Sequence, residues 1–255
     1  MILRRLTNAF RKQDWFTVVI ETLIVVFGVF IGIQMANWNE AQADRARELR
    51  LLAELRAELV ESIEQLEIKS RAFQQVGRSG ARAVAFLDSG KDCGKDCWKV
   101  MVDFFHASQW QQLIVGRATY DELRRNGWPR SRAVVDALEA YHRQAAQISM
   151  PLNAPPAYRN LVRGLIPLAA HRPYWLNCFR LKDGEEMYLE DCSAGVSPQV
   201  AAAAVAAIRA HPDIHRTLTE WVGFGGGVSV TISGLIEAAK RAIAVIDAEL
   251  EKKEI

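Results

Sequence analysis

The most regular pattern along the chain is a continuous run of apolar residues close to its start. Residues 15–38 read WFTVVIETLIVVFGVFIGIQMANW and hold a single ionisable side chain, that of Glu21. Wound as a helix, these 24 residues reach about 35 Å, enough to cross a hydrocarbon core of roughly 30 Å. Tryptophans stand at both ends, as in the aromatic belts of membrane helices. We expect one transmembrane helix at residues 15–38, preceded by a basic tail at residues 1–14.

A second pattern follows, with helical spacing in place of continuous hydrophobicity. Residues 39–76 contain no Gly or Pro, and a stripe of Leu, Ile and Phe recurs every three or four residues with acidic residues on the other positions. This spacing predicts that the membrane helix continues as an amphipathic stalk over residues 39–76. Because the repeat is only approximately heptad, packing against later helices of the same chain is favoured over an intermolecular coiled coil.

The remainder alternates helical patterns with turn residues, and strand signals are sparse. Gly77 and Gly80 are predicted to end the stalk, and the glycines at 223–227 to form a turn between helices. Residues 99–108 fit either a helix or a strand. Other helices are expected at residues 81–87, 119–126, 133–148, 198–210 and 228–252, and a further one opens at Pro212. Residues 151–197 are expected to be irregular apart from a helix at 157–169. The predicted fold class is mostly α, with a helical-bundle domain at residues 77–255.

Charge and cysteine positions suggest an orientation. Basic residues flank both ends of the apolar run, so counting them does not decide which end lies in the cytoplasm. A short basic tail is retained in the cytoplasm, however, whereas a long domain can be translocated largely regardless of charge. All four cysteines lie beyond the run, and an even number suits an oxidising compartment. We expect a cytoplasmic N-terminus, a span in the bacterial inner membrane and a periplasmic domain.

A cleaved signal peptide is the rival interpretation of the apolar run. A basic segment precedes it, as in secretory signals. Its exit, IGIQMANWNE, lacks a convincing small-x-small cleavage site, and the apolar stretch is longer than a usual signal core. An uncleaved anchor is therefore favoured.

Two blocks of the sequence resemble uncharacterised bacterial single-pass proteins. Residues 21–40, ETLIVVFGVFIGIQMANWNE, are similar to the signature of a domain of unknown function numbered 6090, in which a membrane Glu precedes a G-x-x-x-[GA]-x-Q-x-x-N-W-N-E exit. Residues 118–142 resemble a second recurring block, which commonly closes on two tyrosines where this chain has Tyr141 and His142. The resemblance implies membrane anchoring and no known activity.

The predicted anchor has one small and polar face. At 100° per residue, Thr17, Glu21, Gly28, Gly32 and Met35 all fall within about 40° of Glu21. A Gly-x-x-x-Gly pair lets two helix backbones approach closely, and a membrane carboxyl group normally faces protein or water. This face is expected to contact a second copy or another membrane protein. The alternative is that Glu21 simply reaches the membrane interface.

The cysteines allow three disulfide connectivities. We prefer the two local pairs, Cys93 with Cys97 and Cys178 with Cys192, each of which brackets a short polar segment. A zinc site built from all four cysteines is the alternative, but the intervening lengths are not the usual ones.

No motif assigns a reaction. His211 and His215 fit a helix junction better than a metal site, the glycines at 223–227 lack the G-K-[ST] of a phosphate-binding loop, and no serine lies in a G-x-S-x-G motif. The net charge of +2 gives no indication of nucleic-acid binding, and no cofactor is expected. The expected function is a scaffold or partner-binding subunit of a membrane complex or homo-oligomer. The alternatives are an ion-conducting, stator-like subunit that uses Glu21 and an unrecognised periplasmic hydrolase.

Overall fold

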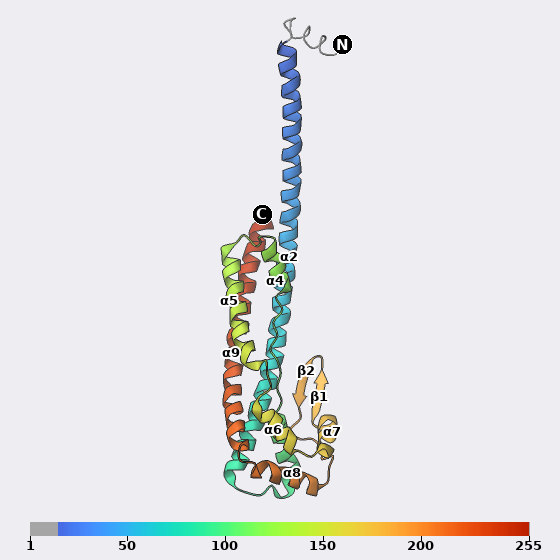
Figure 1. Ribbon diagram of the computed structural model, residues 1–255, viewed down its shortest axis with the longest axis vertical. Coiled ribbons are helices and arrows are strands. Elements are labelled where there is room, and N and C mark those ends of the chain that lie inside the picture. The colour runs from blue at the N-terminus through green and yellow to red at the C-terminus, as the bar shows by residue number, and fades with distance from the viewer. Residues whose placement is uncertain (1–14, 255) are drawn as a thin grey trace, which may run out of the picture. The chain divides into compact units, whose positions relative to one another are not determined.

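The computed structural model describes residues 15–254, apart from the side chains of Thr17, Lys253 and Glu254. The tail predicted at residues 1–14 lies outside the described residues. The chain divides into two units, residues 1–51 and 52–255, and helix α2 (Trp15–Ser89) has residues in both (Figure 1).

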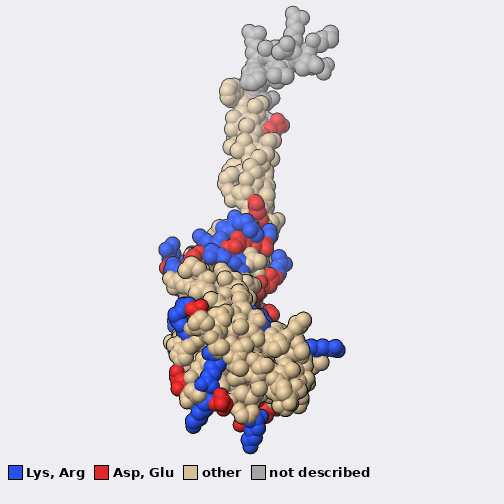
Figure 2. Space-filling view, turned by 60° about the horizontal axis from the view of Figure 1, so that its bottom comes forward, with Lys and Arg blue, Asp and Glu red and all other residues tan. Residues whose placement is uncertain are grey.

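The first unit contains the apolar part of α2. An 18-residue window in this helix has a mean hydropathy of 2.3 and no buried residue. Between the described N-terminal end of α2 and the first cluster of charged residues, the surface of this helix is almost entirely uncharged (Figure 2). By length and composition this helix could cross a membrane. Helix α9 (Ile214–Glu254) passes the same test with a mean hydropathy of 1.3, but 39% of its window is buried, as in a core helix.

The second unit is mostly helical. Helices α5 and α9 run side by side, and α8 packs on α3 across one end of the bundle (Figure 1). The elements are the 3-10 turns η1 (Gly94–Asp96) and η2 (Met150–Leu152), the helices α3 (Cys97–Ala107), α4 (Ala118–Arg125), α5 (Arg132–Ser149), α6 (Ala157–Leu165), α7 (Leu168–Asn177) and α8 (Pro198–Ala210), and the strands β1 (Phe179–Lys182) and β2 (Glu185–Tyr188).

The leucine stripe of α2 forms a central part of the core of the second unit. Leu52, Leu55, Leu59, Leu66 and Phe73 each expose 3% of their surface or less. An amphipathic helix buries such a stripe against neighbouring elements, which here are later helices of the same chain. Within residues 52–76, the prediction that the stripe packs inside the chain is confirmed.

Helix α2 does not end at Gly77 or Gly80, so the predicted end of the stalk was wrong. The helix continues to Ser89. Residues 81–87, expected to form a separate helix, therefore belong to the last turns of α2. A Cβ atom at Gly80 would lie 2.3 Å from Cγ2 of Val222, so this glycine permits close packing of α2 against α9. Gly90, with φ +64°, takes the left-handed position that commonly follows a helix C-terminus.

The turn predicted at the glycines 223–227 was also wrong. These residues lie inside α9, flanked by the buried Trp221 and Val228. Each interior glycine costs a helix about 1 kcal/mol relative to alanine, and burial of the flanking apolar side chains offsets that cost. Local propensity is here overridden by packing.

These glycines give a stability prediction. The double substitution Gly226→Ala/Gly227→Ala should raise the free energy of unfolding by about 1 to 2 kcal/mol, because a Cβ at either position meets nothing within 4 Å and alanine is the better helix former. Gly80→Ala is the matched control and should lower the free energy of unfolding, since the new Cβ atom would overlap Val222. Urea unfolding followed by circular dichroism measures both. A fall for the double variant would contradict the prediction.

The stretch expected to be irregular, residues 151–197, contains more structure than predicted. Its expected helix at 157–169 is two helices, α6 and α7, separated near Pro167. An antiparallel hairpin then pairs Phe179 with Tyr188 and Lys182 with Glu185. Asp183 and Gly184 have φ angles of 51° and 80°, the two positive values that a type I′ turn requires.

Candidate functional site

The residues predicted to form the anchor face lie on the exposed apolar part of α2. A Cβ atom at Gly28 or Gly32 would meet no atom within 4 Å, and Met35 is 52% exposed. Glu21 is exposed as well, whereas the side chain of Thr17 lies outside the described residues. The spacing of these two glycines is therefore not explained by close packing in this chain.

The four cysteines form the two local disulfides. Cys93 is bonded to Cys97 at the start of α3, and Cys178 at the end of α7 is bonded to Cys192 after β2. The Cα atoms are 4.8 Å and 5.1 Å apart, within the usual range. The preferred pairing is confirmed. The zinc alternative is excluded, because no free cysteine remains to bind the metal.

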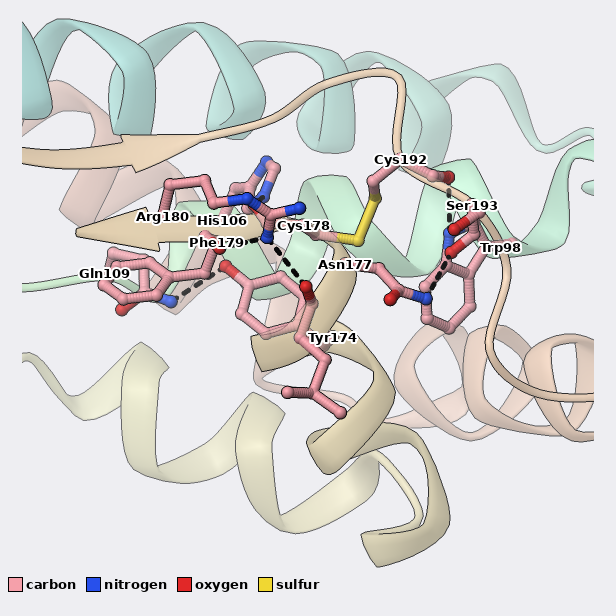
Figure 3. The surroundings of a disulfide bond; sticks show 11 residues. Trp98, His106, Gln109, Tyr174, Asn177, Cys178, Phe179, Arg180, Cys192 and Ser193 are labelled. Carbon is pink, nitrogen blue, oxygen red and sulfur yellow. Dashed lines mark hydrogen bonds between the residues drawn. A yellow bond between two sulfur atoms is a disulfide. The ribbon is translucent and has the colours of Figure 1, made fainter. Parts of the chain in front are cut away.

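Hydrogen bonds tie the segments joined by Cys178–Cys192 to each other and to α3 (Figure 3). Trp98 Nε1 donates to the Cys192 carbonyl oxygen at 3.2 Å, and Asn177 Nδ2 donates to that of Ser193 at 3.0 Å. His106 Nε2 lies 3.3 Å from the Cys178 carbonyl oxygen. The disulfide therefore closes a region in which α3, α7 and the loop after β2 are already bonded together.

His106 lies in the interior beside this disulfide. Its side chain is fully buried, and its ring centroid is 5.3 Å from that of Tyr174 and 5.6 Å from that of Tyr188. Since the Cys178 carbonyl can only accept, Nε2 carries the proton, and the buried Nδ1 has no hydrogen-bond partner. Burial lowers the pKa of His106 to about 4. The ring is neutral at pH 7 and has a structural role.

Two arginines of α6 satisfy polar groups where α3 ends. Arg159 donates to the Ser108 carbonyl at 2.7 Å, and Arg163 donates to the Ser108 hydroxyl and to Gln109 Oε1, both at 2.9 Å. The guanidinium of Arg163 also lies 4.9 Å from the ring centroid of Phe105. Burial lowers the pKa of Arg163 to about 10, so it stays charged at pH 7. The last carbonyl groups of a helix need such donors, and Arg159 supplies one of them, while Arg163 satisfies two side-chain oxygens beside it.

The predicted interpretation of His211 and His215 agrees with the structure. His211 follows the end of α8, and His215 is in the first turn of α9. His215 Nε2 lies 2.7 Å from Asp88 Oδ1, and His211 Nδ1 accepts from the backbone of Asp213. In the described part of the chain no group of three His, Cys, Asp or Glu side chains could hold a metal ion.

A groove of about 290 Å³ opens between α2, the segment before α4, and α5. It brings together residues that are far apart in the sequence, among them Tyr141 and His142, which close the block noted at residues 118–142. The lining residues are Leu55, Glu58, Leu59, Glu61, Ser62, Gln65, Ile114, Val115, Gly116, Ala118, Tyr141 and His142. The groove combines apolar side chains with acidic, hydroxyl and imidazole groups.

Hydrogen bonds and ring contacts hold two of the lining residues, Tyr141 and His142. The hydroxyl groups of Tyr141 and Ser62 are 2.6 Å apart, and the ring of His142 stacks on Tyr120 with centroids 5.1 Å apart. Tyr120 in turn donates to Glu139 at 2.7 Å. His142 is 6% exposed, and its Nε2 atom has no hydrogen-bond partner. Burial, and then the charge of Arg117, lower the pKa of this histidine.

Sequence reasoning did not find the groove. Residues 55–65, 114–118 and 141–142 meet there only because three elements pack together, and no local spacing encodes that meeting. The one available signal was the histidine that replaces the second tyrosine of the block. Comparison with known proteins adds no relative, since no protein-family model, curated protein or solved structure matches the chain.

Proposed function

We propose that this chain is a single-pass membrane protein anchored by residues 15–38, and that its helical unit serves as a scaffold or partner-binding subunit of a membrane complex or homo-oligomer. The observation that carries the proposal is the apolar window of α2, in which no residue is buried by the chain itself. Exposed apolar surface of this extent is unfavourable in water and favourable in lipid.

The two disulfides support an extracytoplasmic position for the helical unit. Structural disulfides persist in oxidising compartments and are rare in the cytosol. Both bonds here lie in the second unit, and Cys178 is fully buried. A cytoplasmic N-terminus, a span in the inner membrane and a periplasmic helical unit are consistent with this chemistry.

Reporter fusions test the topology. A reporter that is active only in the periplasm should work when fused after Ile255, and one that is active only in the cytoplasm should not. The physical reason is that a long domain can cross the membrane while a short basic tail is retained. Fusions placed before the apolar run serve as the control and should give the opposite pattern. If the fusion after Ile255 reports the cytoplasm, the disulfides would lie in a reducing compartment and the proposal would fail.

The same helix offers a surface for assembly. Gly28 and Gly32 are one helical turn apart, and the space beside each is open in this chain. Small residues at this spacing allow two membrane helices to approach closely, and a hydrogen bond from Glu21 could add to the contact. We therefore place the contact with a second copy, or with another membrane protein, on the face defined by Glu21, Gly28, Gly32 and Met35.

Crosslinking in native membranes tests this face. Gly28→Ile and Gly32→Ile should each strongly reduce the yield of crosslinked complex, because a branched side chain holds the backbones apart. Val29→Ile, directed toward lipid, places the same isoleucine side chain outside this face and should leave the yield unchanged. Equal yields for all three variants and the wild type would show that the face is not an interface and that the helix is only a tether.

A further inference from the structure

A basic segment runs from the second half of α5 to β1. Residues 140–182 contain no Asp or Glu, although the chain as a whole has a net charge of only +2. The cations of this segment are Arg143, Arg159, Arg163, Arg172, Arg180 and Lys182. Among the described residues, no ion pair involves any of them. A block of positive charge without compensation attracts a negatively charged partner.

One face of α7, within this segment, combines positive charge with exposed apolar side chains. At 100° per residue, Arg172, Trp175 and Leu176 all fall within about 80° of Leu168. Leu168 is 84% exposed and Leu176 is 61% exposed, and Arg172 is exposed as well. The opposite face of the helix is buried at Tyr174. Helix α7 therefore packs one face on the core and leaves a second apolar face without a partner in this chain.

The β-hairpin extends this face. The ring centroids of Trp175 and Phe179 are 5.0 Å apart. Leu181 lies two residues further along β1, on the same side of the strand as Phe179, and is 66% exposed. Arg180 Nη1 donates to the Leu176 carbonyl oxygen at 2.7 Å, which places this cation against the end of α7 (Figure 3). The α7–β1 patch is defined here as Leu168, Arg172, Trp175, Leu176, Arg180 and Leu181.

The aromatic centre of the patch is held in place. The ring of Trp175 contacts those of Phe105 and Tyr174 edge to face, at centroid distances of 5.8 Å and 5.2 Å. The guanidinium of Arg163 lies 5.5 Å from the centroid of Trp175. Fixed Trp side chains beside Arg are typical anchors of protein–protein contacts, because little conformational freedom is lost when a partner binds them.

The acidic residues of the hairpin do not neutralise the patch. Glu185 is paired with Arg71 at 2.8 Å. Glu186, which is opposite Leu181 in the hairpin, accepts a hydrogen bond from the Tyr188 hydroxyl. Two copies of the patch facing each other would bring their arginines together, so the charge disfavours a second copy of this chain as the occupant.

The position of Arg172 favours a protein partner over a lipid surface. A helix that lies in a membrane interface keeps its cations on the polar face, away from the apolar side chains. Arg172 stands between Leu168 and Leu176 on the apolar face itself, so the occupant has to place a carboxylate among apolar groups. We propose that the α7–β1 patch binds a segment of another polypeptide that presents apolar side chains together with Asp or Glu. This assignment rests on the partner-binding role proposed above and gives the chemistry of the partner.

Photocrosslinking of the full chain in the cells that produce it tests this assignment. The probe is p-benzoylphenylalanine, placed at Leu176 or at Leu181, and Val230 of α9, which is 72% exposed, is the control position. Both patch positions should yield the same crosslinked polypeptide and Val230 should not, because the probe reacts only with groups that lie against it. Mass spectrometry of the crosslinked peptide should find Asp or Glu beside apolar residues.

Charge reversal shows whether the contact depends on the patch. With the probe at Leu181, Arg172→Glu should lower the crosslinking yield by at least about fivefold, because attraction of a carboxylate becomes repulsion. Arg172→Lys keeps the charge and should retain most of the yield. Arg143→Glu is the matched control, since it also reverses an exposed helical arginine of the basic segment, outside the patch, and should leave the yield unchanged.

Four results would overturn the assignment. They are no crosslinked product at the patch, products with lipid or a second copy only, equal yields at the patch and at Val230, and equal losses in Arg172→Glu and Arg143→Glu. None of these results bears on the membrane anchor, which the reporter fusions and the Gly28 and Gly32 variants test separately.

Discussion

Replacing Cys178 and Cys192 by alanine is expected to lower the free energy of unfolding of the helical unit by about 3 kcal/mol. In the chain-entropy description, a disulfide that closes a loop of about 15 residues stabilises the folded state by roughly that amount, because the unfolded chain loses conformational freedom. The bond joins positions 14 residues apart. Cys178 is also fully buried, so alanine removes packed volume but introduces no unsatisfied polar group. Urea unfolding of the two proteins measures the difference.

The second disulfide is the internal control for this measurement. Cys93 and Cys97 are only four residues apart, so Cys93→Ala/Cys97→Ala should lower the free energy of unfolding by the smaller amount of about 2 kcal/mol. Wild type kept in dithiothreitol should lose about as much stability as both double variants together. Mass spectrometry after alkylation without reduction should find no modified cysteine. A free thiol at any of the four positions, or unfolding that does not respond to the reductant, would refute the prediction.

Helical periodicity predicted much of this fold. The leucine stripe at residues 52–76 is buried in the second unit, and the helix expected at residues 198–210 is α8 with the same limits. Both segments bury a regular face and carry strong helix formers. Hydrophobic periodicity indicates which face of a segment will be buried. Predictions from it are therefore most accurate for long segments that pack against a single core.

Glycine was the main source of error, because its role depends on neighbours that are distant in sequence. Gly80 permits the approach of Val222, and the glycines at 223–227 continue a helix that packing holds together. A glycine that ends a helix and a glycine that lets another helix come near have the same local sequence signal. Only the tertiary structure separates the two.

The hairpin was missed for a different reason. Its strands are only four residues long, β1 is mostly exposed, and in β2 only Tyr188 is buried, so neither strand shows the buried alternation that identifies a strand. The turn does have a sequence signal, since Asp183–Gly184 is a dipeptide that favours a type I′ turn. The groove had no comparable signal, because its residues meet only after α2 and α5 have packed.

The buried imidazole of His106 should make the fold sensitive to acid. Burial in the interior lowers the pKa of His106 to about 4, against an ordinary value of 6.5. As the pH falls from 7, the unfolded chain therefore binds a proton at this position near pH 6.5, while the folded chain remains neutral until about pH 4. Because the unfolded state then binds more protons, stability falls with pH across this window. The loss from this residue by pH 4 is about 3 kcal/mol, from a shift of about 2.5 units.

His106→Gln isolates this contribution. Glutamine can still donate a hydrogen bond to the Cys178 carbonyl but does not titrate, so the variant should lose about 3 kcal/mol less stability than wild type between pH 7 and pH 4. The pKa of His142 is also lowered by burial, and its share of the acid sensitivity should remain in the variant. Urea unfolding at half-unit pH steps gives both curves. Parallel curves would mean that His106 carries a proton in the fold as readily as in the unfolded chain, and the closed aromatic interior around it would have to be reconsidered.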